Sequence, residues 1–325
     1  MEALIDFEIL VTLFWQNLGG WLEYPMQAFT FLGSELFFLL VMPALYWSID
    51  PVIGFRAGMM LILSGGLNSI LKMLFLTPRP YWVDSGVRAY SSETSFGMPS
   101  GHSQNSAAIW GIIAATIRKK WAYIFAVLLI FFIGLSRIYL GVHFLHDVLT
   151  GWLAGALVVL LYLKLEAPVS SWLKKRAFGT QLLISFIFAI TFILLGFLAQ
   201  QSAGRWVLPT AWSTLAEAAG AEAPDPLNLD GVITIAGVAF GFTAGFTSWR
   251  KKFGVYEIKC SLVKKMARYA FGLIGIVVLY FGLKLVFPEE PLLIGGIFRF
   301  IRYTLIGMWV TFFAPWFFRL FHLER

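Results

Sequence analysis

The sequence has few charged residues and almost no cysteine. Asp, Glu, Lys and Arg make up 13% of the 325 residues and hydrophobic residues make up 59%, whereas a soluble domain carries about 25% charged residues. This composition excludes an ordinary soluble domain and indicates a polytopic membrane protein. The single cysteine, Cys260, excludes an intrachain disulfide and a cysteine-based metal cluster. The chain starts with the acidic residues Glu2, Asp6 and Glu8, so no cleavable signal peptide is expected.

Apolar runs recur along the chain at lengths close to the roughly 20 residues that cross a bilayer. We therefore predict an all-α, polytopic transmembrane helix bundle of about nine spans. The predicted spans are 34–49, 54–75, 101–118, 121–138, 144–164, 181–200, 231–249, 266–287 and 303–320. An earlier apolar segment, 5–22, contains Glu8, Gln16 and Asn17, and we interpret it as interfacial or re-entrant. If this segment crosses the membrane, the bundle has ten spans.

Positive charge is concentrated in the connections on one side of the predicted bundle. Basic clusters follow the third, fifth and seventh spans, at 118–120, 174–176 and 250–268. Alternating spans place all three clusters on the same side, and an excess of Lys and Arg marks the cytoplasmic side. The net charge of +7 therefore reports orientation, and no nucleic-acid partner is expected. The C-terminus is predicted to be cytoplasmic, and the connections that face outward are 76–100, 139–143 and 201–230.

Polar residues gather at three of the outward ends of the predicted spans. Their members are Lys72 and Arg79, then Ser100, Gly101 and His102, and finally Arg137, His143 and Asp147. Arg and Lys bind phosphate oxygens, and the free N–H groups at a helix start favour an anion. His143 and Asp147, at positions i and i+4, share a helix face, so the carboxylate can orient the imidazole as a nucleophile. His102 comes from another helix and can act as an acid or a base.

Each cluster also has a purely structural interpretation. Lys72 could extend its amine to the membrane interface, and Ser100 could cap a helix. His143 and Asp147 could form a buried polar pair between helices, and His146 is assigned to interfacial packing. These structural interpretations weaken together, because chance would not place all three clusters on one side of the membrane.

The three clusters resemble a known signature. Lys72-x6-Arg79-Pro80, Pro99-Ser100-Gly101-His102 and Ser136-Arg137-x5-His143-x3-Asp147 are similar to the three motifs of the type 2 phosphatidic acid phosphatase superfamily. This superfamily includes lipid phosphate phosphatases, bacterial prenyl-diphosphate phosphatases, glucose-6-phosphatase and the vanadium haloperoxidases. The resemblance covers residues 30–165 and implies a phosphatase-like helical core.

The resemblance also implies a role for each residue of the signature. The implied phosphate-binding residues are Lys72, Arg79, Ser100, Gly101 and Arg137. His143 is implied to be the nucleophile that forms a phosphohistidine, Asp147 to orient His143, and His102 to protonate the leaving group. No metal or other cofactor is expected, and vanadate is expected to inhibit.

We divide the chain into an N-terminal interfacial or membrane segment (1–30), a catalytic core (31–165) and a transmembrane extension of about four spans (166–325). Gly237, Gly241 and Gly245 allow close helix packing within the chain, and a homodimer contact stays open. The segment 201–230 is expected to contribute an interfacial helix near the entrance to the site.

The predicted function is that of an integral membrane phosphatase acting on a lipid phosphate or diphosphate monoester. Its partners are then the lipid substrate and membrane lipids. We expect a bacterial plasma membrane, with the site on the extracytoplasmic side. A lipid-linked phosphotransferase and a glucose-6-phosphatase-like enzyme for a soluble phosphate remain open. A transporter is disfavoured because the polar residues cluster at one end of the spans instead of lining a path.

Overall fold

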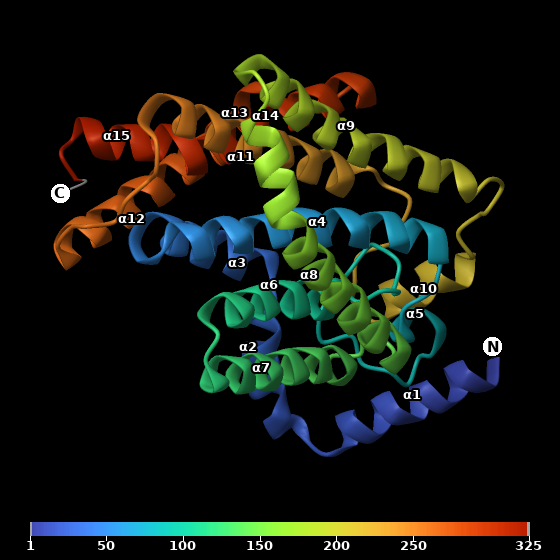
Figure 1. The fold of residues 1–325 in the computed structure, drawn as a ribbon. Helices are drawn as coiled ribbons and strands as arrows, with labels where there is room; N and C mark the ends of the chain where they lie inside the picture. The colour runs from blue at the N-terminus through green and yellow to red at the C-terminus, as the bar shows by residue number, and fades with distance from the viewer. Residues whose placement is uncertain (1, 324–325) are drawn as a thin grey trace. The chain divides into compact units, whose positions relative to one another are not determined.

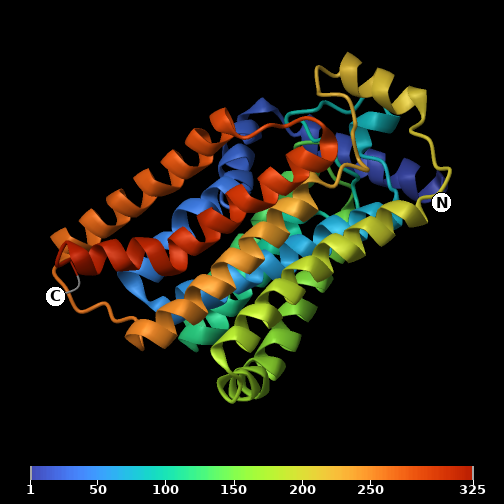
Figure 2. The ribbon, with the colours of Figure 1, turned by 90° about the horizontal axis from the view of Figure 1, so that it is seen from above.

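The computed structural model describes residues 2–323, which are helical almost throughout (Figure 1). Helix accounts for 78% of the structure, and residues 2–323 contain no strand, so the all-α prediction is confirmed. The helices are α1 Glu2–Asn17, α2 Glu23–Phe31, α3 Glu35–Ala44, α4 Pro51–Phe75, α5 Pro80–Val83, α6 Gly101–Ile117, α7 Lys120–Tyr139, α8 Leu145–Lys174, α9 Phe178–Ser202, α10 Thr210–Ala218, α11 Asp230–Phe253, α12 Leu262–Val277, α13 Leu283–Val286, α14 Leu292–Met308 and α15 Ala314–Leu320. Figure 2 gives a second view of the same helices.

Seven helical segments are long and apolar enough to cross a membrane, and the count of nine is not confirmed. The seven are Pro51–Val83, Lys120–Tyr139, Leu145–Lys174, Phe178–Ser202, Asp230–Phe253, Leu262–Val286 and Leu292–Leu320. An eighth results if Gly20–Phe31 and Glu35–Ile49, bent by 48° at their break, form one span. The predicted span at 101–118 corresponds to α6, whose 17 residues extend only about 25 Å. The N-terminal helix α1 has 16 residues and is not a candidate span.

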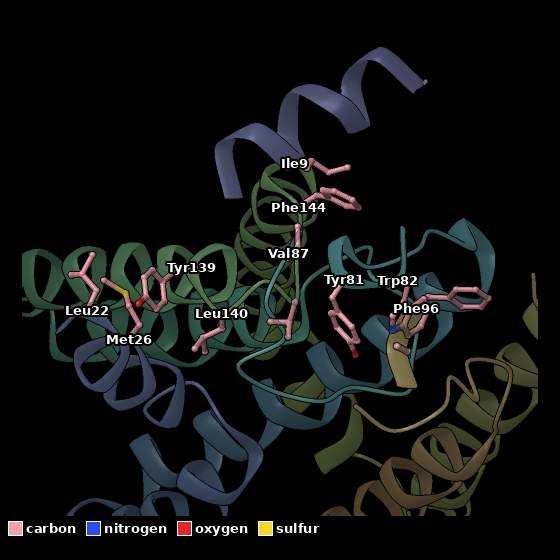
Figure 3. Close-up of a cluster of buried hydrophobic side chains, with 12 residues drawn as sticks. Ile9, Leu22, Met26, Tyr81, Trp82, Val87, Phe96, Tyr139, Leu140 and Phe144 are labelled. Atoms are coloured by element: carbon pink, nitrogen blue, oxygen red, sulfur yellow. The ribbon is translucent and has the colours of Figure 1, made fainter. Parts of the chain in front are cut away.

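Contacts within the chain define two compact units, and the first contains every predicted site residue. This unit consists of the chain up to Phe38, Leu63–Leu160 and Gly196–Asn228. In it α7 packs against α2 and α6, and α10 packs against α5. Its buried apolar core includes Tyr81, Phe96 and Phe144, with Ile9 of α1 beside Phe144 (Figure 3).

The second unit consists of Leu39–Ile62, Leu161–Leu195 and the chain from Leu229 onward. Its closest helix pair is α11 with α14. Gly237, Gly241 and Gly245 of α11 lie against α14 and the turn that follows it, where a Cβ atom would meet backbone or side-chain atoms. Small residues let two helices approach at this distance. The glycine repeat therefore serves packing within the chain.

Substitution of Gly241 tests this packing. A leucine there would overlap the carbonyl of Thr304, so we expect Gly241→Leu to lower the free energy of unfolding by about 1–3 kcal/mol. Thermal unfolding in detergent would measure the loss. Gly179→Leu is the matched control, because a Cβ at Gly179 meets nothing within 4 Å. Equal melting temperatures for Gly241→Leu and the unsubstituted protein would contradict the packing role.

Candidate active site

The eight predicted site residues all come from the first unit, at the ends of its helices or in the connections beside them. Lys72 lies in the last turn of α4, Arg79 precedes α5, Ser100, Gly101 and His102 open α6, Arg137 lies in the last turn of α7, and His143 and Asp147 flank the start of α8. Six of the eight are almost completely buried. Gly101 and His102 are partly exposed.

His143 and Asp147 form a pair at the start of α8. His143 Nδ1 lies 3.3 Å from Asp147 Oδ2, and the same oxygen accepts the Phe144 N–H at 3.0 Å. On the other side of the ring, His143 Nε2 lies 3.2 Å from the Nη1 donor of Arg79. A guanidinium can only donate, so this geometry favours the tautomer with its proton on Nδ1 and a lone pair on Nε2.

The charge around His143 keeps its ring neutral. Burial lowers the pKa of His143 well below its ordinary value, and the nearby cations Arg79, Lys72 and Arg137 lower it further. A neutral imidazole whose Nε2 carries the lone pair is the nucleophilic form. The ring nitrogen that carries the lone pair is therefore the one that faces the cations.

Lys72 and Arg79 are fixed by the loop that precedes α6. The amine of Lys72 donates to Ser95 Oγ at 2.9 Å and to the Phe96 carbonyl at 2.7 Å. The guanidinium of Arg79 donates to the Ser95 carbonyl at 2.7 Å and to the Val142 carbonyl at 2.9 Å. These contacts fix the positions of both cations beside His143.

The start of α6 contacts Asp147 through Ser100. Ser100 caps this helix, because its Oγ accepts the Ser103 N–H at 3.4 Å, and its own N–H donates to the Asp147 carbonyl at 2.9 Å. Gly101 lies against Asn68, where a Cβ would be 3.1 Å from Oδ1. A backbone hydrogen bond thus links the start of α6 to the His143–Asp147 pair, which is called the dyad below.

His102 is placed differently from the others. Its ring lies beside Gly33 in the break between α2 and α3, where a Cβ would be 3.5 Å from His102 Cδ2. Within residues 2–323 it forms no hydrogen bond with the other predicted site residues.

Glu93 belongs to the cluster although the sequence patterns did not identify it. One carboxylate oxygen accepts from Arg137 Nη2 at 2.5 Å, and the other lies 3.8 Å from Arg79 Nη2. Burial alone would raise the pKa of Glu93, but Arg79 and Arg137 outweigh it and hold the pKa well below its ordinary value. Thr30 of α2 also accepts from Arg137, at 2.5 Å. The charge of the two arginines was the one indication in the sequence, because buried cations beside a membrane need a carboxylate to balance them.

The segment 203–228 covers the loop that carries Glu93. Its backbone N–H groups at Asp225 and Glu222 donate to the Thr94 carbonyl at 3.0 Å and to Ser92 Oγ at 2.8 Å. Trp212 of α10 lies 5.9 Å from Trp82 of α5, measured between ring centroids. The helix expected in 201–230 is thus present as α10 and packs beside the candidate site.

The first unit thus brings a buried His–Asp pair, two arginines and a lysine together at the start of a helix. Family models match two parts of the chain. Residues 54–171 match the PAP2 superfamily, and residues 233–325 match the transmembrane extension of PAP2 superfamily phosphatases. The chain belongs to the PAP2 superfamily.

Two curated relatives and one solved structure show the extent of the similarity. Phosphatidylglycerophosphatase B of Bacillus subtilis is 30% identical over 168 residues, which cover 48% of this chain and 80% of that protein. Human glucose-6-phosphatase 3 is 31% identical over 183 residues, covering 49% of this chain and 53% of that protein, so the chain spans about half the length of this relative. The crystal structure of a transmembrane PAP2-type phosphatidylglycerolphosphate phosphatase from Bacillus subtilis is 26% identical and covers 52% of this chain and 89% of that chain, with a TM-score of 0.45.

The pairing of Glu93 with the two arginines predicts a pH-dependent stability. Glu93→Gln should lower the free energy of unfolding at pH 7 by about 1–3 kcal/mol, because the buried guanidiniums lose their counter-charge. A depressed pKa gives stability that is complete above the ordinary value of 4.5 and is lost as the pH falls through the lower, folded-state pKa.

The gap in melting temperature between the unsubstituted protein and Glu93→Gln should therefore be constant at neutral pH and shrink below pH 4.5. Thermal unfolding across this range measures it. Glu217→Gln, at an exposed position of α10, is the control and should show no gap. A gap for Glu93→Gln that stays constant into acid would contradict the ion pair.

Proposed function

We propose that the chain is an integral membrane phosphatase that hydrolyses a lipid phosphate or diphosphate monoester through a phosphohistidine at His143. The observation that carries the proposal is the position of His143 between Asp147 on one ring nitrogen and Arg79 on the other. No other described histidine has a carboxylate on one side and a guanidinium on the other. The proposal gives each residue of the signature, in the position described above, the role that the resemblance implies.

In the first step, the phosphoryl oxygens bind Lys72, Arg79 and Arg137 next to the start of α6. The lone pair on His143 Nε2 attacks phosphorus, and the bond from phosphorus to the ester oxygen breaks. Burial and Arg137 lower the pKa of His102 to about 3, so His102 takes up a proton together with the anionic substrate and donates it to that departing oxygen. Asp147 accepts the hydrogen bond from His143 Nδ1–H throughout and stabilises the positive charge that the ring acquires.

In the second step, water attacks the phosphohistidine from the side that the alcohol has left. His102, now without its proton, accepts one from the water. The bond from phosphorus to Nε2 breaks, and its electron pair returns to the ring of His143. Inorganic phosphate then leaves, and His143 and His102 are both restored to their starting states.

The position of the site favours a substrate anchored in lipid. The candidate residues gather where α4, α6, α7 and α8 begin or end, so a phosphate headgroup would enter at the membrane surface while its tails remain in lipid. Phe31 and Leu36, which flank the break beside His102, are both exposed apolar side chains. We place the site on the extracytoplasmic side and the C-terminus in the cytoplasm, because the basic clusters mark the opposite side.

A soluble sugar phosphate is the second candidate substrate. The similarity to human glucose-6-phosphatase 3 favours it, because the same phosphate-binding residues would serve either leaving group. Phosphoryl transfer to an alcohol instead of water would also use the same histidines. Product analysis with an added alcohol separates transfer from hydrolysis.

The test is phosphate release by the purified protein in detergent with excess EDTA. The panel consists of phosphatidate, phosphatidylglycerol phosphate, undecaprenyl diphosphate, sphingosine phosphate and glucose 6-phosphate. We expect His143→Ala to reduce release at least about a thousandfold, and an acid-labile phosphoenzyme to form only when His143 is present. His322→Ala, at an exposed histidine near the C-terminus, is the matched control. Release that survives His143→Ala would overturn the proposal.

The role of His102 gives a separate prediction. An acid is needed when the leaving group is an alkoxide and is dispensable when it is p-nitrophenolate. His102→Ala should therefore slow phosphoenzyme formation from phosphatidate by about 10²–10⁴-fold, and much less from p-nitrophenyl phosphate. Burst kinetics would measure the first step for each substrate. Equal losses with both substrates would argue against His102 as the acid.

A further inference from the structure

The N-terminal helix α1 carries a buried carboxylate that the proposed reaction does not use. Glu8 is only 3% exposed, although its helix presents Leu4, Phe7 and Leu10 outward. An ionisable group in such an apolar setting is costly unless it has a specific partner. The fold gives Glu8 that partner from a residue 138 positions away.

The partner is His146, the histidine that the sequence patterns assigned only to packing. Glu8 Oε1 accepts the His146 backbone N–H at 2.9 Å, and Glu8 Oε2 lies 2.5 Å from His146 Nδ1. The opposite ring nitrogen, Nε2, lies 3.2 Å from Asp147 Oδ1. Each ring nitrogen of His146 therefore faces a carboxylate, an arrangement that suits an imidazolium with a proton on both nitrogens.

His146 faces the oxygen of Asp147 that is left without a hydrogen bond. Asp147 Oδ2 accepts hydrogen bonds from His143 Nδ1 and from the Phe144 N–H. Asp147 Oδ1 is fully buried and has no aligned hydrogen bond. The ring of His146, which stacks on Phe144 with centroids 5.6 Å apart, is the charged group at this oxygen.

We propose that Glu8 and His146 are positioning residues that hold Asp147 in the orientation His143 requires. The structure assigns them to a chain of four groups: Glu8, His146, Asp147 and His143. Glu8 balances the charge of His146, and His146 in turn places its own charge 3.2 Å from the second oxygen of Asp147. Asp147 then stays anionic and aligned when His143 takes up the phosphoryl group. This inference rests on the proposed function, since it concerns the same nucleophile.

If Glu8 only held α1 in place, its loss would have the same effect as the loss of any other contact of α1. Another residue of α1 therefore provides the control. Gln16, eight residues after Glu8 in the same helix, also holds α1 against the unit. Its amide donates to the Arg88 and Tyr139 carbonyls, both at 2.9 Å, and its oxygen accepts the Arg88 N–H at 3.1 Å. Gln16 has no contact with the dyad. A variant at Gln16 therefore loosens α1 without touching the chain of four groups.

The experiment compares Glu8→Gln, Glu8→Asp and Gln16→Leu in the full chain. Glu8→Gln keeps the size of the side chain, removes its charge and leaves one acceptor oxygen in place of two. We expect its kcat to fall about 10–100-fold, by analogy with the outer partners of metal-bound histidines, with KM within about twofold. Glu8→Asp should recover part of kcat. Gln16→Leu should lower the melting temperature and leave kcat within about twofold.

Vanadate binding provides a readout that needs no turnover. Vanadate bonds to the nucleophile, whereas inorganic phosphate binds the cations alone. By calorimetry, Glu8→Gln should weaken vanadate binding about as much as it lowers kcat and leave phosphate binding unchanged. Wild-type kcat in Glu8→Gln overturns the inference, as does a parallel loss of kcat, KM and melting temperature like that of Gln16→Leu.

The two proposals can fail separately. A protein that binds vanadate through His143, with weaker binding in Glu8→Gln, but releases no phosphate would refute the proposed function and retain the positioning role. Phosphate release that depends on His143 but not on Glu8 would do the opposite.

Discussion

The rest of the candidate site depends on the contacts of Asp147. Its Oδ2 meets His143 and the Phe144 N–H, and its backbone carbonyl accepts from Ser100 at the start of α6. Even the loop before α6 is shaped by it, because a Cβ at Gly97 would lie 3.0 Å from Oδ2 and 2.5 Å from the Pro78 carbonyl. A bulkier residue at Gly97 would push the loop away from the dyad.

The second constraint is the turn that carries His143 from α7 to α8. The carbonyl of Arg137 accepts both the Val142 and His143 N–H groups, at 3.2 and 3.3 Å. This tight reversal requires Gly141, whose φ of +73° is unfavourable for other residues. Arg137 therefore acts twice: its side chain reaches Glu93, and its carbonyl fixes the backbone of the candidate nucleophile. The spacing of the third motif reflects this turn as much as the chemistry.

Short-range patterns predicted much of this site, whereas its long-range partners were not accessible from the sequence. The spacing of His143 and Asp147 predicted their pairing, and the positions of Lys72 and Arg137 at helix ends predicted that they share a region. Glu93 is 44 positions from Arg137 and Glu8 is 138 from His146. No periodicity connects such residues. Charge was the one indication available. An ionisable residue in an apolar segment predicts that a partner exists but does not identify that partner.

The same reasoning explains where the predicted spans differ from the structure. Hydropathy detects apolar length, and the apolar second half of α6 led to a predicted span although its first turns bury Ser103, Gln104, Asn105 and Ser106. Asn105 and Gln104 find their partners on α4, at Ser64 Oγ and the Ser64 carbonyl. A helix that buries amides against a neighbour is held by those hydrogen bonds as well as by apolar contact. These polar contacts fix the register of α6 against α4. Seventeen residues are therefore enough for α6 to present Ser100, Gly101 and His102 to the dyad.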